Sequence, residues 1–282
     1  MKSSFRLGTV AGIPLFLHWT FFLIPAWTIL SGLLGGSTLV GIGVSLLFTA
    51  GVFGTVVLHE LGHALAAKRF GIRTQDIILM PIGGVARLQR MPPKPFQELV
   101  VALAGPAVNV VLAGGLLLVA LPLVGLSGLI APGSVAIEFF VGMIAVNLIM
   151  IVFNLLPAFP MDGGRVLRAI LSMRWGHLRA TRTAVRVARV MALVIAVAGL
   201  VWLDAPMLLF IAAFVYFGAG QELRLAEYEA MMQHRADPFG YTYEPEGPAF
   251  SEERRSGPVY YADGRNPNDA RGVFMRFYVH RD

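Results

Sequence analysis

Six apolar stretches, most of them long enough to cross a lipid bilayer, constrain this chain more than any other feature. A bilayer core takes about 20 apolar residues of helix. The stretches cover residues 13–34, 38–67, 98–121, 135–156, 187–203 and 205–221, and the last two are short. Charged residues make up only 14% of the chain, whereas soluble domains have about 25%. The sequence therefore predicts an all-α polytopic membrane protein with six transmembrane helices.

Basic residues give the predicted orientation, because Lys and Arg near the ends of spans stay in the cytoplasm. They precede the first stretch, separate the second from the third and the fourth from the fifth, and follow the sixth. The loops after the first, third and fifth stretches contain neither residue. We therefore expect a multi-pass protein of the cell membrane with both termini in the cytoplasm. Because the arginines cluster beside apolar runs, the net charge of +6 does not indicate nucleic-acid binding.

Two segments are predicted to be extended rather than helical. Residues 77–88 carry a proline and a glycine pair between β-branched runs, a pattern typical of two short strands. A similar pair is expected at residues 5–10 and 13–17. Their apolar character predicts small membrane-embedded β segments near the cytoplasmic side, which are tolerated only where protein covers the backbone groups. An ordinary cytoplasmic loop is the alternative.

The chain divides by composition into two parts. Residues 1–221 are predicted to form the six-span membrane domain. Residues 222–282 are rich in Pro, Gly, Tyr and Arg, and we expect a cytoplasmic, largely disordered polar tail, because such a composition buries too little apolar surface to fold alone. A final strand is predicted at residues 272–279.

The second apolar stretch contains a metal-binding pattern, VVLHELGHAL at residues 56–65. On a helix, His59 and His63 lie on one face, so both imidazoles can reach one zinc ion. Glu60 lies beside that face and is expected to take a proton from a metal-bound water. There are two alternatives. Glu60 could pair with a histidine in a purely structural network, or the helix could lie at the protein surface. The uncharged run 38–57 argues against a surface helix, and three ionisable groups inside a bilayer require compensation.

The third protein ligand of a catalytic zinc must be a His, Asp or Glu, because the chain has no cysteine. Five candidates are set aside by predicted side, loop position or place at a helix start: Glu138, Asp204, Asp76, His177 and Glu98. Asp162 lies in NLLPAFPMDGGR, where prolines disfavour helix and glycines permit tight backbone geometry. Asp162 is therefore the favoured ligand, with a helix-capping role as its alternative. His18 lies at similar depth and stays open as a ligand, although an interfacial histidine beside Trp19 is the simpler interpretation.

With these motifs the chain resembles the site-2 protease family, peptidase family M50, of intramembrane zinc metalloproteases. HELGH at 59–63 resembles the family's HExxH, NLLPAFPMDGGR at 154–165 its second motif, and GPAVN at 105–109 its GPxxN signature. The resemblance covers about residues 5–221. We expect neither the PDZ-like insertion nor the paired CBS domains that some members carry.

The resemblance implies roles for eight residues. One Zn²⁺ per chain is implied to bind to His59, His63 and Asp162. Glu60 is implied to be the catalytic base. The substrate is implied to contact two asparagines and a strand that pairs with its unwound backbone: Asn154, Asn109, Gly84 and Val85.

The predicted activity is hydrolysis of a peptide bond in or near the transmembrane segment of a membrane-anchored protein, such as an anti-sigma or pro-sigma regulator. A membrane metal transporter is one alternative, but the outer half of the predicted membrane domain offers almost no polar lining. A noncatalytic scaffold that binds membrane proteins is the other, and it would have little use for Glu60. The sequence makes no prediction of oligomeric state.

Overall fold

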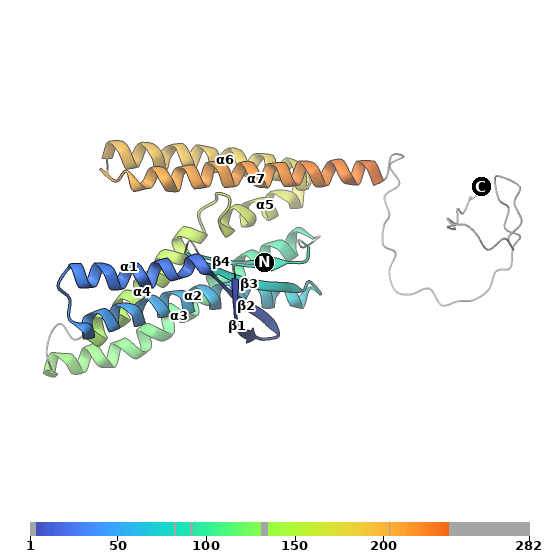
Figure 1. Ribbon diagram of the computed structural model, residues 1–282. Helices are drawn as coiled ribbons and strands as arrows, with labels where there is room; N and C mark the ends of the chain where they lie inside the picture. The colour runs from blue at the N-terminus through green and yellow to red at the C-terminus, as the bar shows by residue number, and fades with distance from the viewer. Residues whose placement is uncertain are drawn as a thin grey trace, which may run out of the picture. The chain divides into compact units, whose positions relative to one another are not determined.

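The computed structural model describes residues 4–81, 83–90, 92, 94–130, 135–202 and 204–236 (Figure 1). All of them belong to the unit formed by residues 1–238. The predicted tail from residue 237 onward, including the strand expected at 272–279, lies outside the described residues.

Five helices of the described chain are long and apolar enough to cross a membrane. They are α2 (Leu39–Arg69), α3 (Pro95–Ile130), α4 (Val135–Asn154), α6 (His177–Val197) and α7 (Met207–Ala236). α6 continues into a π-helical turn, η2 (Ala198–Trp202). The helices α6 and α7 are longer than predicted, because the polar residues at their ends continue the helices. Residues 222–236, predicted as tail, are therefore part of α7.

The first predicted span is only partly helical. Its beginning forms strand β2 (Ile13–His18), followed by the 3₁₀ turn η1 (Trp19–Phe22) and helix α1 (Leu23–Leu34). The apolar helical stretch Trp19–Leu34 is shorter than the other five. The reason is tertiary, since β2 pairs in parallel with a strand from more than fifty residues later. Six full-length spans are thus replaced by five long helices and one shorter one in the described chain.

A small mixed sheet lies beside α2. Its order is β1 (Ser4–Val10), β2, β3 (Thr74–Met80) and β4 (Gly83–Leu88). The two hairpins are antiparallel, and β2 pairs in parallel with β3. Both predicted extended pairs thus form strands. Ala11 and Gly12 join β1 to β2 with φ values of 52° and 84°, as a two-residue hairpin turn with positive φ at both positions requires. β4 is an outer strand of this sheet.

The C-terminal helices pack through small residues. α5 (Asp162–Trp175) contacts α3 and α6, and α6 lies beside α7 along its length (Figure 1). Ala184, Ala188 and Ala192 are spaced by four on α6 and are buried against the loop before α5 and against α7. Small side chains on one helix face let backbones approach closely, which favours association of membrane helices. This packing fixes the loop that precedes α5.

Candidate metal centre

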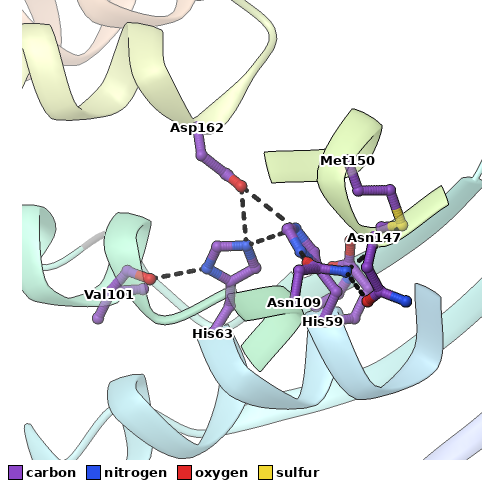
Figure 2. A network of polar contacts seen from close by, with 9 residues as sticks. His59, His63, Val101, Asn109, Asn147, Met150 and Asp162 are labelled. Atoms are coloured by element: carbon purple, nitrogen blue, oxygen red, sulfur yellow. Dashed lines mark hydrogen bonds and ion pairs between the residues drawn. The ribbon is translucent and has the colours of Figure 1, made fainter. Parts of the chain in front are cut away.

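Three side chains from two distant parts of the chain meet at one point. His59 and His63 project from α2, and Asp162 reaches them from the start of α5 (Figure 2). The two Nε2 atoms are 3.1 Å apart. Asp162 Oδ2 lies 3.2 Å from Nε2 of His59 and 3.1 Å from Nε2 of His63. All three residues are buried. They are the group of His, Asp or Glu side chains in the described chain whose ligand atoms converge in this way.

The geometry of this triangle fits a zinc ion. A tetrahedral zinc with metal–ligand distances of about 2.0–2.1 Å keeps its ligand atoms about 3.3 Å apart. The three ligand-atom distances of 3.1–3.2 Å agree with that spacing. Two imidazoles and one carboxylate are also a donor set of catalytic zinc, which leaves the fourth position for water or substrate. These residues could therefore hold one zinc ion.

Glycine on α3 makes room for the two imidazoles. A Cβ atom on Gly105 would lie 2.2 Å from Nε2 of His63 and 2.7 Å from Nε2 of His59. On α2, a Cβ on Gly62 would lie 2.7 Å from the carbonyl oxygen of Ala104. The two helices therefore cross closely only because each has a glycine at the contact. The GPAVN segment thus contributes space to the site as well as side chains.

A folded-back loop places Asp162. α4 ends at Asn154, and α5 begins at Asp162 after an extended N-cap residue, Met161. A Cβ on Gly163 would lie 2.2 Å from the carbonyl oxygen of Leu156, so the loop lies directly against the first turn of α5. Asp162 is thus not the N-cap, and its carboxylate is directed to the histidines instead. The glycine pair permits the close contact that the sequence predicted.

A second set of contacts orients the imidazoles. His59 Nδ1 is 2.5 Å from Asn109 Oδ1, and His63 Nδ1 is 2.7 Å from the carbonyl oxygen of Val101 (Figure 2). Because carbonyl oxygens only accept, Nδ1 carries the proton in both rings and Nε2 is left free as a metal ligand. Asn109 in turn donates from Nδ2 to Oδ1 of Asn147, 3.0 Å away. Asn109 and Asn147 are both fully buried.

The predicted substrate residues divide into two groups. Glu60, Gly84, Val85 and Asn154 line a cavity of about 530 Å³ together with the three converging side chains. Asn109 is not among the described residues that line it. The structure thus places Asn109 behind His59 rather than at the cavity surface. Its partner Asn147 was not predicted, although a polar residue two turns before Asn154 within an apolar run is a signal that the sequence carries.

Glu60 lies between the metal centre and the sheet. Its Oε2 accepts a hydrogen bond of 3.1 Å from the backbone N–H of Ala86 in β4. A Cβ on Gly84 would lie 2.7 Å from Cγ of Glu60. Gly84 therefore lets the strand approach α2 closely enough for this hydrogen bond to form.

An ion pair joins the two strands of that hairpin. Arg87 donates from Nε to Oδ1 of Asp76 over 2.7 Å, and the two residues are paired across β3 and β4. This hydrogen bond raises the pKa of the Arg87 guanidinium. Asp76 is buried, although the sequence favoured a solvated loop position. The ion pair helps to fix the register that brings Ala86 to Glu60.

His18, the alternative ligand, lies outside the metal centre. Its Nδ1 is 2.7 Å from Oγ1 of Thr20 and accepts from the backbone N–H of Thr20, which caps η1. Its ring lies 6.0 Å from that of Trp19. The hydrogen bond to Thr20 and the neighbouring Trp19 ring agree with the simpler interpretation of a hydrogen-bonded histidine beside an aromatic.

The central part of the chain matches a known protein family. Residues 47–198 match the family model described as Peptidase family M50. This range includes both histidines, the glutamate, the GPAVN segment and the aspartate of the site. The converging residues thus all fall within the matched region.

Curated relatives and a solved structure agree with this match. The chain is 37% identical over 235 residues to Zinc metalloprotease MJ0392 of Methanocaldococcus jannaschii, which covers 83% of this chain and 65% of that protein. It is 32% identical over 245 residues to Putative zinc metalloprotease Rip3 of Mycobacterium tuberculosis. That match covers 79% of this chain and 59% of that protein. The solved Site-2 Protease from Methanocaldococcus jannaschii aligns with a TM-score of 0.53 and 36% identity, covering 78% of this chain and 95% of that one. The chain thus spans less than two thirds of the length of these curated relatives.

Proposed function

The chain belongs to peptidase family M50, and from this premise we propose that it is an intramembrane zinc metalloendopeptidase. The proposed reaction is hydrolysis of a peptide bond in or near the transmembrane segment of a membrane-anchored protein. The observation that carries the proposal is the convergence of His59, His63 and Asp162 within one cavity that Glu60 also lines. A metal transporter or a noncatalytic scaffold gives no role to Glu60 in that cavity.

Metal binding, proton transfer and ligand orientation can each be assigned to residues of the site. His59, His63 and Asp162 would hold one zinc ion, which when bound supplies a Lewis acid that polarises the peptide carbonyl and lowers the pKa of water. Glu60 would take the proton of the attacking water and then pass it to the leaving amine. The N–H of Ala86 holds the carboxylate of Glu60 beside the cavity. Asn109 would orient His59 and thereby fix the ligand nitrogen.

The substrate has to be extended at the point of cleavage, because a helix keeps its carbonyl groups in backbone hydrogen bonds. β4 is an outer strand of the sheet, and an extended segment can add to such an edge through backbone hydrogen bonds. Gly84 and Val85 of this strand line the cavity on one side, and Asn154 lines it as well. We therefore assign substrate binding to these three residues. A single-span regulator of the anti-sigma or pro-sigma type is the proposed kind of substrate.

The proposed setting is the cell membrane, crossed six times with both termini in the cytoplasm. The five long apolar helices and the shorter Trp19–Leu34 supply the crossings. The arginines of α5 and of the first half of α6 support the cytoplasmic assignment of that end, since basic residues stay on that side. The metal centre then lies in the cytoplasmic half of the membrane domain.

The substitution Glu60→Gln tests this function. Crosslinking of Glu60→Ala protein in its native membrane first identifies trapped single-span proteins. One of these is then offered to the purified chain in lipid nanodiscs. Cleavage by Glu60→Gln should fall by about 10²–10⁴-fold, whereas bound zinc should stay at the unsubstituted level. Glu138→Gln, at the other end of the membrane domain, is the matched control. Unchanged cleavage by Glu60→Gln would exclude Glu60 as the base, and zinc flux into liposomes would favour transport.

A further inference from the structure

Two arginines one turn apart on α5 have opposite surroundings. Arg168 is buried, donates from Nε to Glu98 Oε1 over 2.7 Å, and donates from Nη1 to Glu222 Oε2 over 2.9 Å. Its guanidinium also lies over the ring of Phe159, 5.0 Å from the ring centre. The charge of Arg168 is thus fully compensated by neighbouring side chains. Arg165 is different in each of these respects.

Arg165 lines the cavity that holds the metal centre. It follows Asp162 by three residues on α5, and such residues are neighbours on a helix surface with Cβ atoms about 5–6 Å apart. Its Nε is buried and has no hydrogen-bond partner among the residues that the structure describes. Among the described residues that line the cavity, Arg165 is also the single Lys or Arg.

In the described chain, the two carboxylates of the cavity contact groups other than Arg165. The carboxylate of Glu60 accepts from Ala86, and Oδ2 of Asp162 contacts both histidines. Much of the remaining lining is apolar, with Val56, Met150, Phe153 and Phe214. A buried donor without a partner is unfavourable, and such a group in a native protein calls for an explanation, such as local strain, a functional role, or a water or ion that binds it. The guanidinium of Arg165 is therefore free to bind an acceptor that enters the cavity.

The chemistry of a guanidinium selects the acceptor. Its planar, always-charged fork matches a carboxylate in a bidentate geometry, and charge-assisted bonds of this kind are about twice as strong as neutral ones. A carboxylate in a transmembrane segment is rare and costly without a partner. A substrate that carries one would therefore gain most from Arg165.

We propose that Arg165 is a specificity-determining residue that binds an acidic side chain of the substrate, Asp or Glu, close to the bond that is cut. This inference rests on the proposed function, because it takes the occupant of the cavity to be a substrate peptide. It adds a substrate class, since it selects transmembrane segments with an acidic residue near the cleavage site. Arg165 does not act on the reacting atoms in this proposal, so neutral peptides are still bound and cut, but more weakly.

The test uses synthetic single-span peptides as probes. Each has an apolar segment of about 20 residues with a central Gly-Pro break, and a single Asp is moved through the positions on both sides of the break. Matched peptides carry Asn or Lys at the same positions. Binding is measured with full-length Glu60→Gln protein in nanodiscs, and cleavage with the unsubstituted zinc-loaded protein by mass spectrometry.

The expected result is a preference for Asp over Asn of about tenfold or more at one or two positions. Arg165→Gln should abolish this preference while it keeps binding of the Asn peptides, and Arg165→Glu should shift it to Lys. Arg186→Gln, an exposed arginine on α6, is the matched control and should retain the Asp preference. Bound zinc, measured for every variant, verifies that the site is folded.

The outcomes separate this inference from the proposed function. An Asp preference that persists in Arg165→Gln, or equal binding of all peptides to the Glu60→Gln protein with Arg165 intact, overturns the role of Arg165. Cleavage without an Asp preference supports the protease function alone. Binding that depends on Asp and Arg165 but is never followed by cleavage supports the subsite and counts against the protease function. A chain that neither binds nor cuts any peptide counts against both.

Discussion

The carboxylate of Glu60 is hydrogen-bonded to the backbone N–H of Ala86, 3.1 Å away. In an antiparallel ladder, successive residues turn their N–H and C=O groups to opposite sides. The N–H of Ala86 points away from β3, because it donates to Glu60. The N–H of the preceding residue, Val85, therefore points toward β3. The outer edge of β4 thus holds the proposed base, and the same edge is where an extended substrate is proposed to pair. In this proposal, one strand sets both the position of the base and the register of the substrate.

Ala86→Pro should lower kcat without loss of zinc. Proline removes only the N–H that binds Glu60, and it is tolerated on an outer strand where the N–H is not part of the ladder. A hydrogen bond to a charged group contributes about 1.5–3 kcal/mol, so kcat should fall about tenfold or more. Steady-state kinetics and bound zinc are the measurements. Ala86→Ser keeps the N–H and is the control. A proline variant with unchanged kcat would show that this hydrogen bond does not position the base.

Asp162→Asn should release zinc, whereas His18→Ala should retain it. Asparagine keeps the size of the ligand but loses the negative charge that faces both histidines. His18 is bonded to Thr20 and contributes nothing to the converging group. Zinc content after dialysis against a chelator, determined by elemental analysis, distinguishes the two variants. The reverse result would make His18 the third ligand.

Gly105→Ala should also prevent zinc binding. The added Cβ would lie 2.2 Å from Nε2 of His63, so the imidazole has to move out of the triangle. Gly114 lies on the same helix, and nothing lies within 4 Å of a Cβ built there. Gly114→Ala should therefore keep zinc and stabilise the helix by about 0.5–1 kcal/mol, because Ala has the higher helix propensity. Equal zinc content in the two variants would argue against a metal at this triangle.

Asn109→Leu should lower zinc affinity, whereas Asn154→Ala should weaken substrate binding. Asn109 is behind His59 and hydrogen-bonded to it, and removal of such a partner typically lowers metal affinity 10–100-fold. Asn154 lines the cavity, so Asn154→Ala should raise KM and leave zinc affinity unchanged. Competition with a zinc chelator and steady-state kinetics measure the two effects. Reduced zinc affinity in Asn154→Ala would contradict the assignment of Asn154 to substrate binding alone. Normal zinc affinity in Asn109→Leu would contradict the role of Asn109 in orienting His59.

The parts of the site that the sequence predicts are those set by local spacing. His59 and His63 are four residues apart, so the helix alone brings them together. Asp162 is predicted from membrane depth and from the prolines and glycines beside it, because these set the chain direction locally. The long apolar helices follow from the same local information.

The features that the sequence does not predict depend on partners far along the chain. Residues 13–17 are predicted as extended, but their parallel pairing with β3, more than fifty residues later, is not. Asp76 looks solvated, yet its partner Arg87 lies across the hairpin. Asn109 is in a recognisable motif, but only the packing of α3 against α2 shows that it contacts His59. These three contacts between distant segments do not follow from local spacing.

The buried ion pairs of Arg168 give the final prediction, which concerns stability. Arg168 on α5 is 3% exposed and binds Glu98 of α3 and Glu222 of α7. Arg168→Met leaves the buried carboxylate of Glu98 and the partly buried one of Glu222 without their cation, and breaking a buried pair in this way costs about 3–5 kcal/mol. Arg182→Met is the control, because its ion pair with Glu227 is exposed and contributes at most about 1 kcal/mol.

The free energies of unfolding of the two variants in detergent, from denaturant titration, measure the difference. Because Arg168 ties α5 to two helices, its loss should also loosen the start of α5 and lower zinc affinity through Asp162. Adding Glu222→Gln to Arg168→Met removes one of the two unpaired charges and should recover part of the lost stability. Equal unfolding free energies for Arg168→Met and Arg182→Met would mean that the three-residue network does not hold α5 in place.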